Sequence, residues 1–196
     1  HQQTIEAVKN SGAKKLIGTF VVGGINPAMP QGSVYVLGNL IGFGNYNIKW
    51  DQNLPFHNAE MFEPFCPTLT EKLCEAGRKM EFDVKENATY VCFNGYPRIE
   101  TRKELEFYNK QGWDIVGQTC DPEATIARLN QLCYAGIAVQ IDDPSGRADY
   151  INSLKQKTQS LYHYFQPQLA HGINIVMQVS ISGKENFNGF FVIKNN

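Results

Sequence analysis

Two carboxylates that lie far apart in the sequence, Glu100 and Asp142, each follow a predicted strand. Glu100 stands in the loop "NGYPRIET", and Asp142 ends the strand "CYAGIAVQID". Ligands of open α/β sheets bind beyond the carboxyl ends of the strands, so both side chains would face one mouth. A carboxylate accepts a hydrogen bond from a ring N–H, and a protonated acid donates one to a ring nitrogen where charge develops. The pair therefore predicts a site for a nitrogen heterocycle.

Two more loops would reach the same mouth. Gly23 and Gly24 end an apolar strand, where a glycine turn lets the backbone approach a phosphate group. Gln118 and Thr119 follow the short strand "WDIVG". The glycine pair therefore suggests an anion subsite beside the heterocycle site.

Each acidic residue also has a purely structural interpretation. Glu100 fits a carboxylate before a helix, where the helix dipole favours negative charge. Asp142 fits a turn that leads into Pro144. Both interpretations stay open on the pattern of residues alone.

The elements that would position these loops alternate between strands and helices. Expected strands cover residues 15–25, 33–43, 88–95, 113–117 and 133–142, and expected helices cover 68–80, 102–111, 122–132 and 148–165. This order predicts an α/β domain of three layers with a mostly parallel central sheet. Asn188-Gly189, between two further strands within 173–194, predicts a C-terminal β-hairpin. We expect a single domain over residues 1–196.

Local signals mark the beginnings of three helices. Thr68 with Glu71 and Thr101 with Glu104 have the spacing of a capping box, in which each side chain satisfies the other residue's backbone N–H. Pro122 fits the first turn of a helix.

Composition excludes several classes of protein. The 196 residues carry 18 basic and 19 acidic side chains without a basic stripe, which argues against a nucleic-acid partner. No apolar run approaches the roughly 20 residues of a membrane span, so we expect no membrane partner. The five cysteines form no CxxC pair, which argues against a zinc site and a disulfide framework. We expect reduced, buried thiols and a cytoplasmic protein.

Four stretches resemble one known family. They read "VGGINPAMPQGSVYVLGNLIGF", "PFCPTLTEKLCEAG", "TYVCFNGYPRIET" and "DIVGQTCDPEATIARLNQLCYAGIAV". Together they are similar to the trimeric purine nucleoside phosphorylase and methylthioadenosine phosphorylase family, from about Ile5 to Phe165. The resemblance implies a phosphorylase-type fold, a homotrimer, and cleavage of a purine nucleoside with phosphate as co-substrate and no cofactor.

The resemblance also implies roles for residues on the base side. Glu100 falls where the family holds N1 and the exocyclic oxygen of a 6-oxopurine. Ile99 takes the place of an aromatic that packs on the base. Asp142 matches the residue that contacts N7.

Roles on the phosphate and sugar side follow in the same way. Thr119 falls at a position that touches phosphate and sugar, and Gln118 replaces a methionine under the ribose. His57 is one position from a histidine that approaches the sugar 5′ group. Gly23 and Gly24 belong to a strand loop that supplies backbone N–H groups to phosphate.

The sequence departs from the family where phosphate binds. Phe20 occupies part of a strand loop that usually carries a hydrogen-bond donor. Tyr96 is inserted between the glycine and the proline of the usual G-P-R. The family's glycine-rich loop and Arg-His pair would lie before His1. Three functions therefore stay open: a phosphorylase, a phosphate-independent nucleosidase, and a catalytically degenerate nucleoside-binding, storage or interaction protein.

Overall fold

The computed structural model describes residues 2–44, 48, 58–93, 95, 98–142, 173–181 and 187–195, with only the backbone for Asp142 and the last two ranges. The helices are α1 (Gln2–Asn10), α2 (Pro67–Lys79), α3 (Arg102–Lys110) and α4 (Cys120–Leu129). The strands are β1 (Lys15–Gly24), β2 (Val34–Gly42), β3 (Val84–Cys92), β4 (Ile115–Gly117), β5 (Cys133–Asp142), β6 (Ile173–Ile181) and β7 (Phe187–Asn195). From β1 to β5 these elements occur in the order that the sequence predicts.

The strands form one mixed sheet in the order β4-β3-β2-β5-β1-β7-β6. The pairs β1–β5, β2–β3 and β3–β4 are parallel. The pairs β1–β4, β1–β7, β2–β5 and β6–β7 are antiparallel, so the sheet is mixed and not mostly parallel. Because β4 pairs with both β3 and β1, the first five strands close into a ring.

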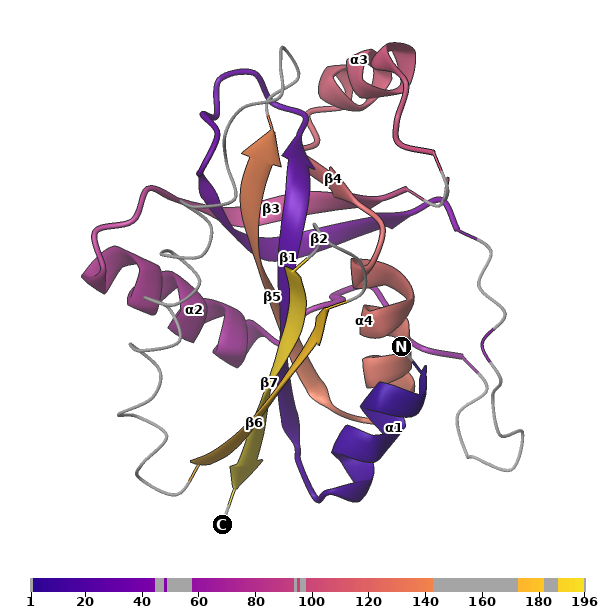
Figure 1. The fold of residues 1–196 in the computed structure, drawn as a ribbon, viewed down its shortest axis with the longest axis vertical. Helices are drawn as coiled ribbons and strands as arrows, with labels where there is room; N and C mark the ends of the chain where they lie inside the picture. The colour runs from indigo at the N-terminus through magenta and orange to yellow at the C-terminus, as the bar shows by residue number, and fades with distance from the viewer. Residues whose placement is uncertain are drawn as a thin grey trace.

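Helices cover both faces of these strands (Figure 1), with α2 on one side and α1 and α4 on the other. Alternate residues of β1 explain this arrangement, because successive side chains of a strand point to opposite faces. Leu16 and Phe20 are buried in the cluster that includes Ile5 of α1 and Ala127 of α4. Ile17 is buried in the cluster that includes Leu69 and Leu73 of α2. The result is a mixed α/β fold with helices packed on both sides of the strands.

Helix starts agree with the sequence in one case and differ in another. Thr101 caps α3 through the complete capping box with Glu104, as predicted. The capping box predicted at Thr68 is wrong, because α2 begins at Pro67 and Cys66 is its N-cap residue without a side-chain hydrogen bond. A proline fits this place because backbone N–H groups in the first turn of a helix have no partner within the helix, so proline, which has no N–H, loses no hydrogen bond. The helix predicted over 148–165 lies outside the described residues.

The cysteines only partly match the expected reduced state. Cys74, Cys92 and Cys120 are buried free thiols. Cys66 and Cys133 form a disulfide across 67 positions of sequence, so the prediction of reduced thiols is wrong for this pair. Sequence spacing could not reveal the pair, because the fold brings its Cα atoms within 5.3 Å of each other.

Candidate functional site

The ends of four strands meet at one place in the sheet, where the sequence predicts the site. Gly23 of β1 lies opposite Asp142 of β5 in the parallel ladder and opposite Val116 of β4 in the antiparallel one. Gly117, the last residue of β4, lies opposite Cys92 at the end of β3. The loops predicted to carry the site therefore leave the sheet from neighbouring positions.

The loop after β3 carries two of the predicted base-side residues. Ile99 is 64% exposed, and Glu100 is partly buried. The side-chain amide Nε2 of Gln118, in the loop after β4, donates to the backbone oxygen of Arg98 at 3.1 Å. This hydrogen bond joins the two loops, so Ile99, Glu100 and Gln118 belong to one connected region.

Thr119 is held from below by a buried tyrosine. Its backbone N–H donates to the hydroxyl oxygen of Tyr90 at 3.5 Å. A Cβ on Gly117 would lie 2.0 Å from the same hydroxyl oxygen, so a side chain at this position would displace Tyr90. Burial is the main reason that the pKa of the Tyr90 hydroxyl is raised well above its ordinary value, so the group stays protonated.

Phe20 is a core side chain. It is 3% exposed and packs edge-to-face against Tyr90, with the ring centres 5.5 Å apart. The ring therefore fills space between β1 and β3 and offers no hydrogen-bond donor to an anion. At this position the strand supplies packing, as the departure from the family pattern suggested.

Gly24 has a packing reason to be a glycine. A Cβ there would lie 2.2 Å from Nε2 of Gln140, a fully buried side chain. Gln140 is fixed in turn, since its Oε1 accepts from the hydroxyl of Tyr35 and its Nε2 donates to the backbone oxygen of Met29. The glycine at this position is thus explained without a phosphate group.

Asp121, which follows β4 at the start of α4, is a partly buried carboxyl group to which sequence reasoning assigned no role. Its Oδ1 accepts from the hydroxyl of Thr125 at 2.7 Å. A Cβ on Gly42, the last residue of β2, would lie 2.8 Å from its Oδ2. Burial raises the pKa of Asp121, against the opposing effect of the Thr125 hydroxyl. No local pattern distinguishes this aspartate from an ordinary residue in the first turn of a helix.

Some predicted site residues cannot be placed in this geometry. His57 and Tyr96 lie outside the described residues. For Asp142 the position of the backbone is described, opposite Gly23, and its side chain is not. Their proposed contacts with a ligand therefore remain predictions.

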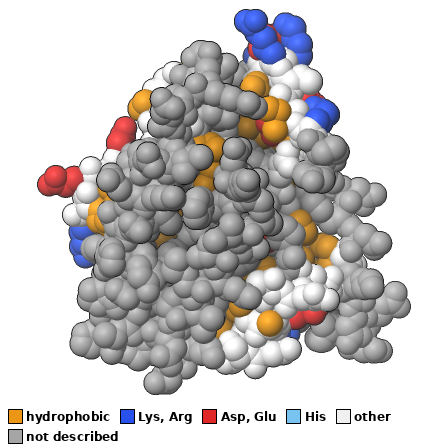
Figure 2. All heavy atoms as spheres, viewed as in Figure 1, with side chains coloured by type: hydrophobic (Ala, Val, Ile, Leu, Met, Phe, Trp, Pro, Cys, Tyr) orange, Lys and Arg blue, Asp and Glu red, His pale blue; other side chains and the backbone are white. Residues whose placement is uncertain are grey.

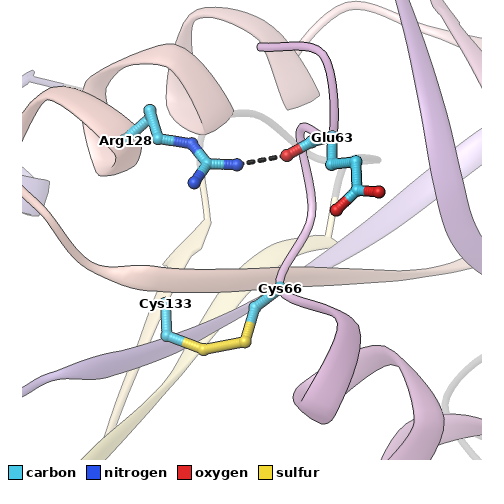
Figure 3. The surroundings of a disulfide bond; sticks show 4 residues. All are labelled: Glu63, Cys66, Arg128 and Cys133. Atoms are coloured by element: carbon cyan, nitrogen blue, oxygen red, sulfur yellow. Dashed lines mark hydrogen bonds between the residues drawn. A yellow bond between two sulfur atoms is a disulfide. The ribbon is translucent and has the colours of Figure 1, made fainter. Parts of the chain in front are cut away.

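A cavity of about 820 Å³ lies in a different part of the molecule, beside the disulfide. Its lining comes from residues 58–67, from the end of α4 and from the beginning of β5, and it includes both disulfide cysteines. Figure 3 shows how this region is held: the guanidinium of Arg128 donates to the backbone oxygen of Glu63, next to the Cys66–Cys133 bond. This cavity lies at the amino end of β5, whereas the predicted site lies at its carboxyl end.

The charged surface around α3 contrasts with the interior. Figure 2 shows Lys and Arg side chains at the end of the molecule where α3 lies in Figure 1. Arg102 and Lys103 are 92% and 85% exposed, and both form ion pairs with Glu106.

Within the described ranges, no helix has both the length and the apolar character that a bilayer span requires.

Comparisons with known proteins agree on one family. The sequence profile of the Phosphorylase superfamily matches residues 1–164. A probable S-methyl-5'-thioinosine phosphorylase of Thermodesulfovibrio yellowstonii is 32% identical over 164 residues, which are 82% of this chain and 61% of that protein. A 6-oxopurine nucleoside phosphorylase of Pyrococcus furiosus is 32% identical over 154 residues, covering 74% of this chain and 58% of that protein.

Solved structures show the same similarity. The crystal structure of a double mutant of the adenosine/methylthioadenosine phosphorylase of Schistosoma mansoni, in complex with adenine, superposes with a TM-score of 0.69. Its sequence is 26% identical, and the match covers 84% of this chain and 66% of that chain. The chain spans about three fifths of the length of the curated relatives named above.

Proposed function

Because the chain belongs to the Phosphorylase superfamily, we propose that the protein cleaves the N-glycosidic bond of a purine nucleoside with phosphate as nucleophile. A phosphate oxygen forms a bond to C1′ of the sugar, and the bond from C1′ to the purine nitrogen breaks. The electron pair of that bond goes to the purine, which then takes up a proton. The products are a free base and a pentose 1-phosphate, and the substrate is of the inosine, guanosine or methylthio-nucleoside type.

The observation that carries this proposal is the meeting of the strand ends. Gly23 lies between Asp142 and Val116 in its two ladders, and Gly117 lies opposite Cys92. A nucleoside and an anion need binding groups from several loops at once, and this arrangement brings those loops to one place. The names of the relatives support this chemistry, and the meeting of the strand ends supports this location for it.

On the base side, Glu100 would accept a hydrogen bond from N1–H of a 6-oxopurine, and Ile99 would pack on the ring. Asp142 would act at N7, where a protonated carboxylic acid can donate a hydrogen bond as charge moves onto the base. Stabilising this departing base is the larger demand, because the transition state places negative charge on it. These two carboxyl groups are the proposed catalytic residues.

On the phosphate and sugar side, Gly23 and Gly24 would offer backbone N–H groups to the anion. Thr119 would contact both phosphate and sugar, and Gln118 would lie under the ribose. His57 would approach the sugar 5′ group. Phosphate acts here as a co-substrate, and we propose no other cofactor.

A second candidate is cleavage without phosphate, or nucleoside binding without catalysis. It is favoured by Phe20, whose buried ring offers no donor, and by the Thr119 N–H, which donates to Tyr90. Water as the nucleophile needs a base nearby but no cluster of anion-binding donors. The proposed phosphorylase remains the first candidate because relatives with this activity match most of the chain.

The resemblance supports further proposals about the whole protein. We propose a homotrimer in which residues 1–196 act as one domain. We also propose a cytoplasmic setting, which the three buried free thiols favour and the Cys66–Cys133 disulfide opposes. The antiparallel pairing of β6 with β7 along both strands supports a C-terminal hairpin, although the joining residues 182–186 lie outside the described ranges.

One assay separates the candidates. The purified protein is incubated with inosine, adenosine and methylthioadenosine, with and without phosphate, and release of the base is measured. Release that depends on phosphate, together with formation of the sugar 1-phosphate, supports the proposal. Release without phosphate supports the nucleosidase, and the absence of release with every substrate contradicts both enzymatic proposals.

A further inference from the structure

Arg98 makes an unusual set of contacts for a side chain that is 53% exposed. Its Nη1 and Nη2 atoms donate to Oε2 and Oε1 of Glu104, both at 2.9 Å, in a two-point ion pair. Nη1 also donates to the backbone oxygen of Ile99 at 3.1 Å. The guanidinium carbon lies 4.6 Å from the centre of the Phe93 ring, within range of a cation–π interaction. One side chain thus contacts the end of β3, the loop and α3.

The partner of this ion pair is itself fixed. Oε2 of Glu104 accepts from the backbone N–H of Thr101 at 2.7 Å and from its hydroxyl at 2.8 Å. The pKa of Glu104 is lowered to about 2, mainly by the hydrogen bonds from Arg98 and to a smaller extent by those from Thr101. The carboxylate therefore stays charged at any pH at which an enzyme would be assayed. The loop of residues 98–101 is tied to α3 at both of its ends.

The backbone of Arg98 makes a third connection. Its N–H donates to the oxygen of Gly95 at 2.8 Å, and its oxygen accepts from Gln118 of the loop after β4 at 3.1 Å. An ordinary exposed ion pair contributes little to stability. This one differs because its planar guanidinium serves a carboxylate, a backbone oxygen and an aromatic ring together, which a lysine cannot do.

We propose that Arg98 is a positioning residue for recognition of the purine. Arg98 and Thr101, the two ends of the loop, are both hydrogen-bonded to Glu104. Arg98 thereby holds Ile99 and Glu100, which lie between them, in the place where they meet the base. The inference rests on the proposed function, because it assigns the base to these two residues. The phosphate side depends on Gly23 and Thr119, which belong to other strands and have no contact with the guanidinium among the interactions described above.

Arg98→Lys tests the proposal, because lysine keeps the charge and loses the two-point geometry. We expect kcat/KM for inosine to fall between about tenfold and a hundredfold, the range for a displacement near 1 Å of a substrate-binding group. KM for phosphate should stay within about twofold of the wild-type value, since the phosphate side is held elsewhere. A purely structural role would not separate the two substrates in this way.

Arg102→Lys is the matched control. Arg102 is the first residue of α3, and its Nε atom lies 3.3 Å from Oε1 of Glu106 in an exposed ion pair. We expect wild-type values for both substrates. An Arg98→Lys variant with wild-type kinetics, or with equal losses for inosine and phosphate, overturns the proposal.

A double-mutant cycle tests the contact itself. If Arg98 acts through Glu104, then Arg98→Lys combined with Glu104→Gln should lower kcat/KM for inosine no further than the more damaging single change. Full additivity of the two losses contradicts a shared role.

Hydrogen exchange keeps this proposal distinct from the proposed function. If the wild-type protein releases no purine, the function fails, while positioning can still be measured on the backbone. We expect Arg98→Lys to speed exchange at the amide of Thr101 by about tenfold or more, because the bond to Glu104 that protects it loosens. Arg102→Lys should leave that rate unchanged. Equal rates in wild type and Arg98→Lys overturn the positioning role whatever the activity.

Discussion

Asp121 shows how the fold changes the chemistry of a single residue. Its carboxyl group is enclosed between the start of α4 and the end of β2, and one hydroxyl group, that of Thr125, donates to it. Burial raises its pKa above the ordinary value of 3.8. An acid whose pKa is higher in the folded than in the unfolded protein destabilises the fold once it must ionise. The destabilisation grows as the pH rises above about 4 and is complete above the folded pKa.

Asp121→Asn should therefore raise the free energy of unfolding at neutral pH. The amide oxygen can still accept from Thr125, and no charge has to be buried. The gain over wild type should shrink as the pH is lowered through 4 and vanish well below it, where the wild-type carboxyl group is protonated in both the folded and the unfolded protein. Urea unfolding at several pH values measures this difference. A difference that does not depend on pH would show that ionisation of Asp121 is not its cause.

At the scale of single elements, local signals predicted most of the helices and strands, whereas the long-range strand pairings could not be predicted. The capping box of Thr101 and Glu104 depends on three consecutive peptide units and was confirmed. The antiparallel pairings β2–β5 and β1–β4 depend on segments far apart in the sequence. Alternating strands and helices suggest parallel neighbours, but they do not fix which strands become neighbours. The mixed sheet therefore needed the structure.

Gly24→Ala tests the packing of β1 against β5. The added methyl group would overlap the amide of Gln140, so the free energy of unfolding should fall by about 1–3 kcal/mol. The same change in a Gln140→Ala background should cost less, because the obstructing amide is gone. Chemical denaturation of the four proteins measures both values. An equal cost in both backgrounds would contradict the packing explanation.

The disulfide is an element-scale feature with a measurable consequence. It joins the residue before α2 to the first residue of β5 and closes a loop across 67 positions of sequence. Reduction should lower the free energy of unfolding by about 2–5 kcal/mol, largely because the unfolded chain gains freedom. Thermal unfolding with and without dithiothreitol measures the loss, and a Cys66→Ala/Cys133→Ala protein should show no response to the reductant.

Thiol titration is the direct control for that experiment. The unfolded, unreduced protein should expose three free thiols out of five cysteines. Five free thiols would show that the pair is reduced in the protein as isolated. An unchanged melting temperature on reduction would show that the bond does not constrain the chain.

For the whole molecule, the closed ring of five strands accounts for the location of the proposed site. Sequence reasoning predicted that loops carrying Glu100, Gln118 and Asp142 would leave the sheet at one edge, and the ladders agree for the backbone. It missed Arg98 because its contacts join three elements, although a glutamate six residues later was already recognised as a cap. The reason is general: a local motif shows which backbone groups are satisfied, not which distant side chains share them.

Glu100 is proposed to bind a purine at these strand ends, and Glu100→Gln tests this role. Losing the charge that accepts from N1–H should weaken binding of the transition state by about 1.5–3 kcal/mol, which lowers kcat/KM for inosine by roughly ten- to 150-fold. Activity with adenosine, which has no N1–H to donate, should not fall. The control Glu106→Gln, on α3, should leave activity with both substrates unchanged. An unchanged ratio of kcat/KM for inosine to that for adenosine would contradict this role of Glu100.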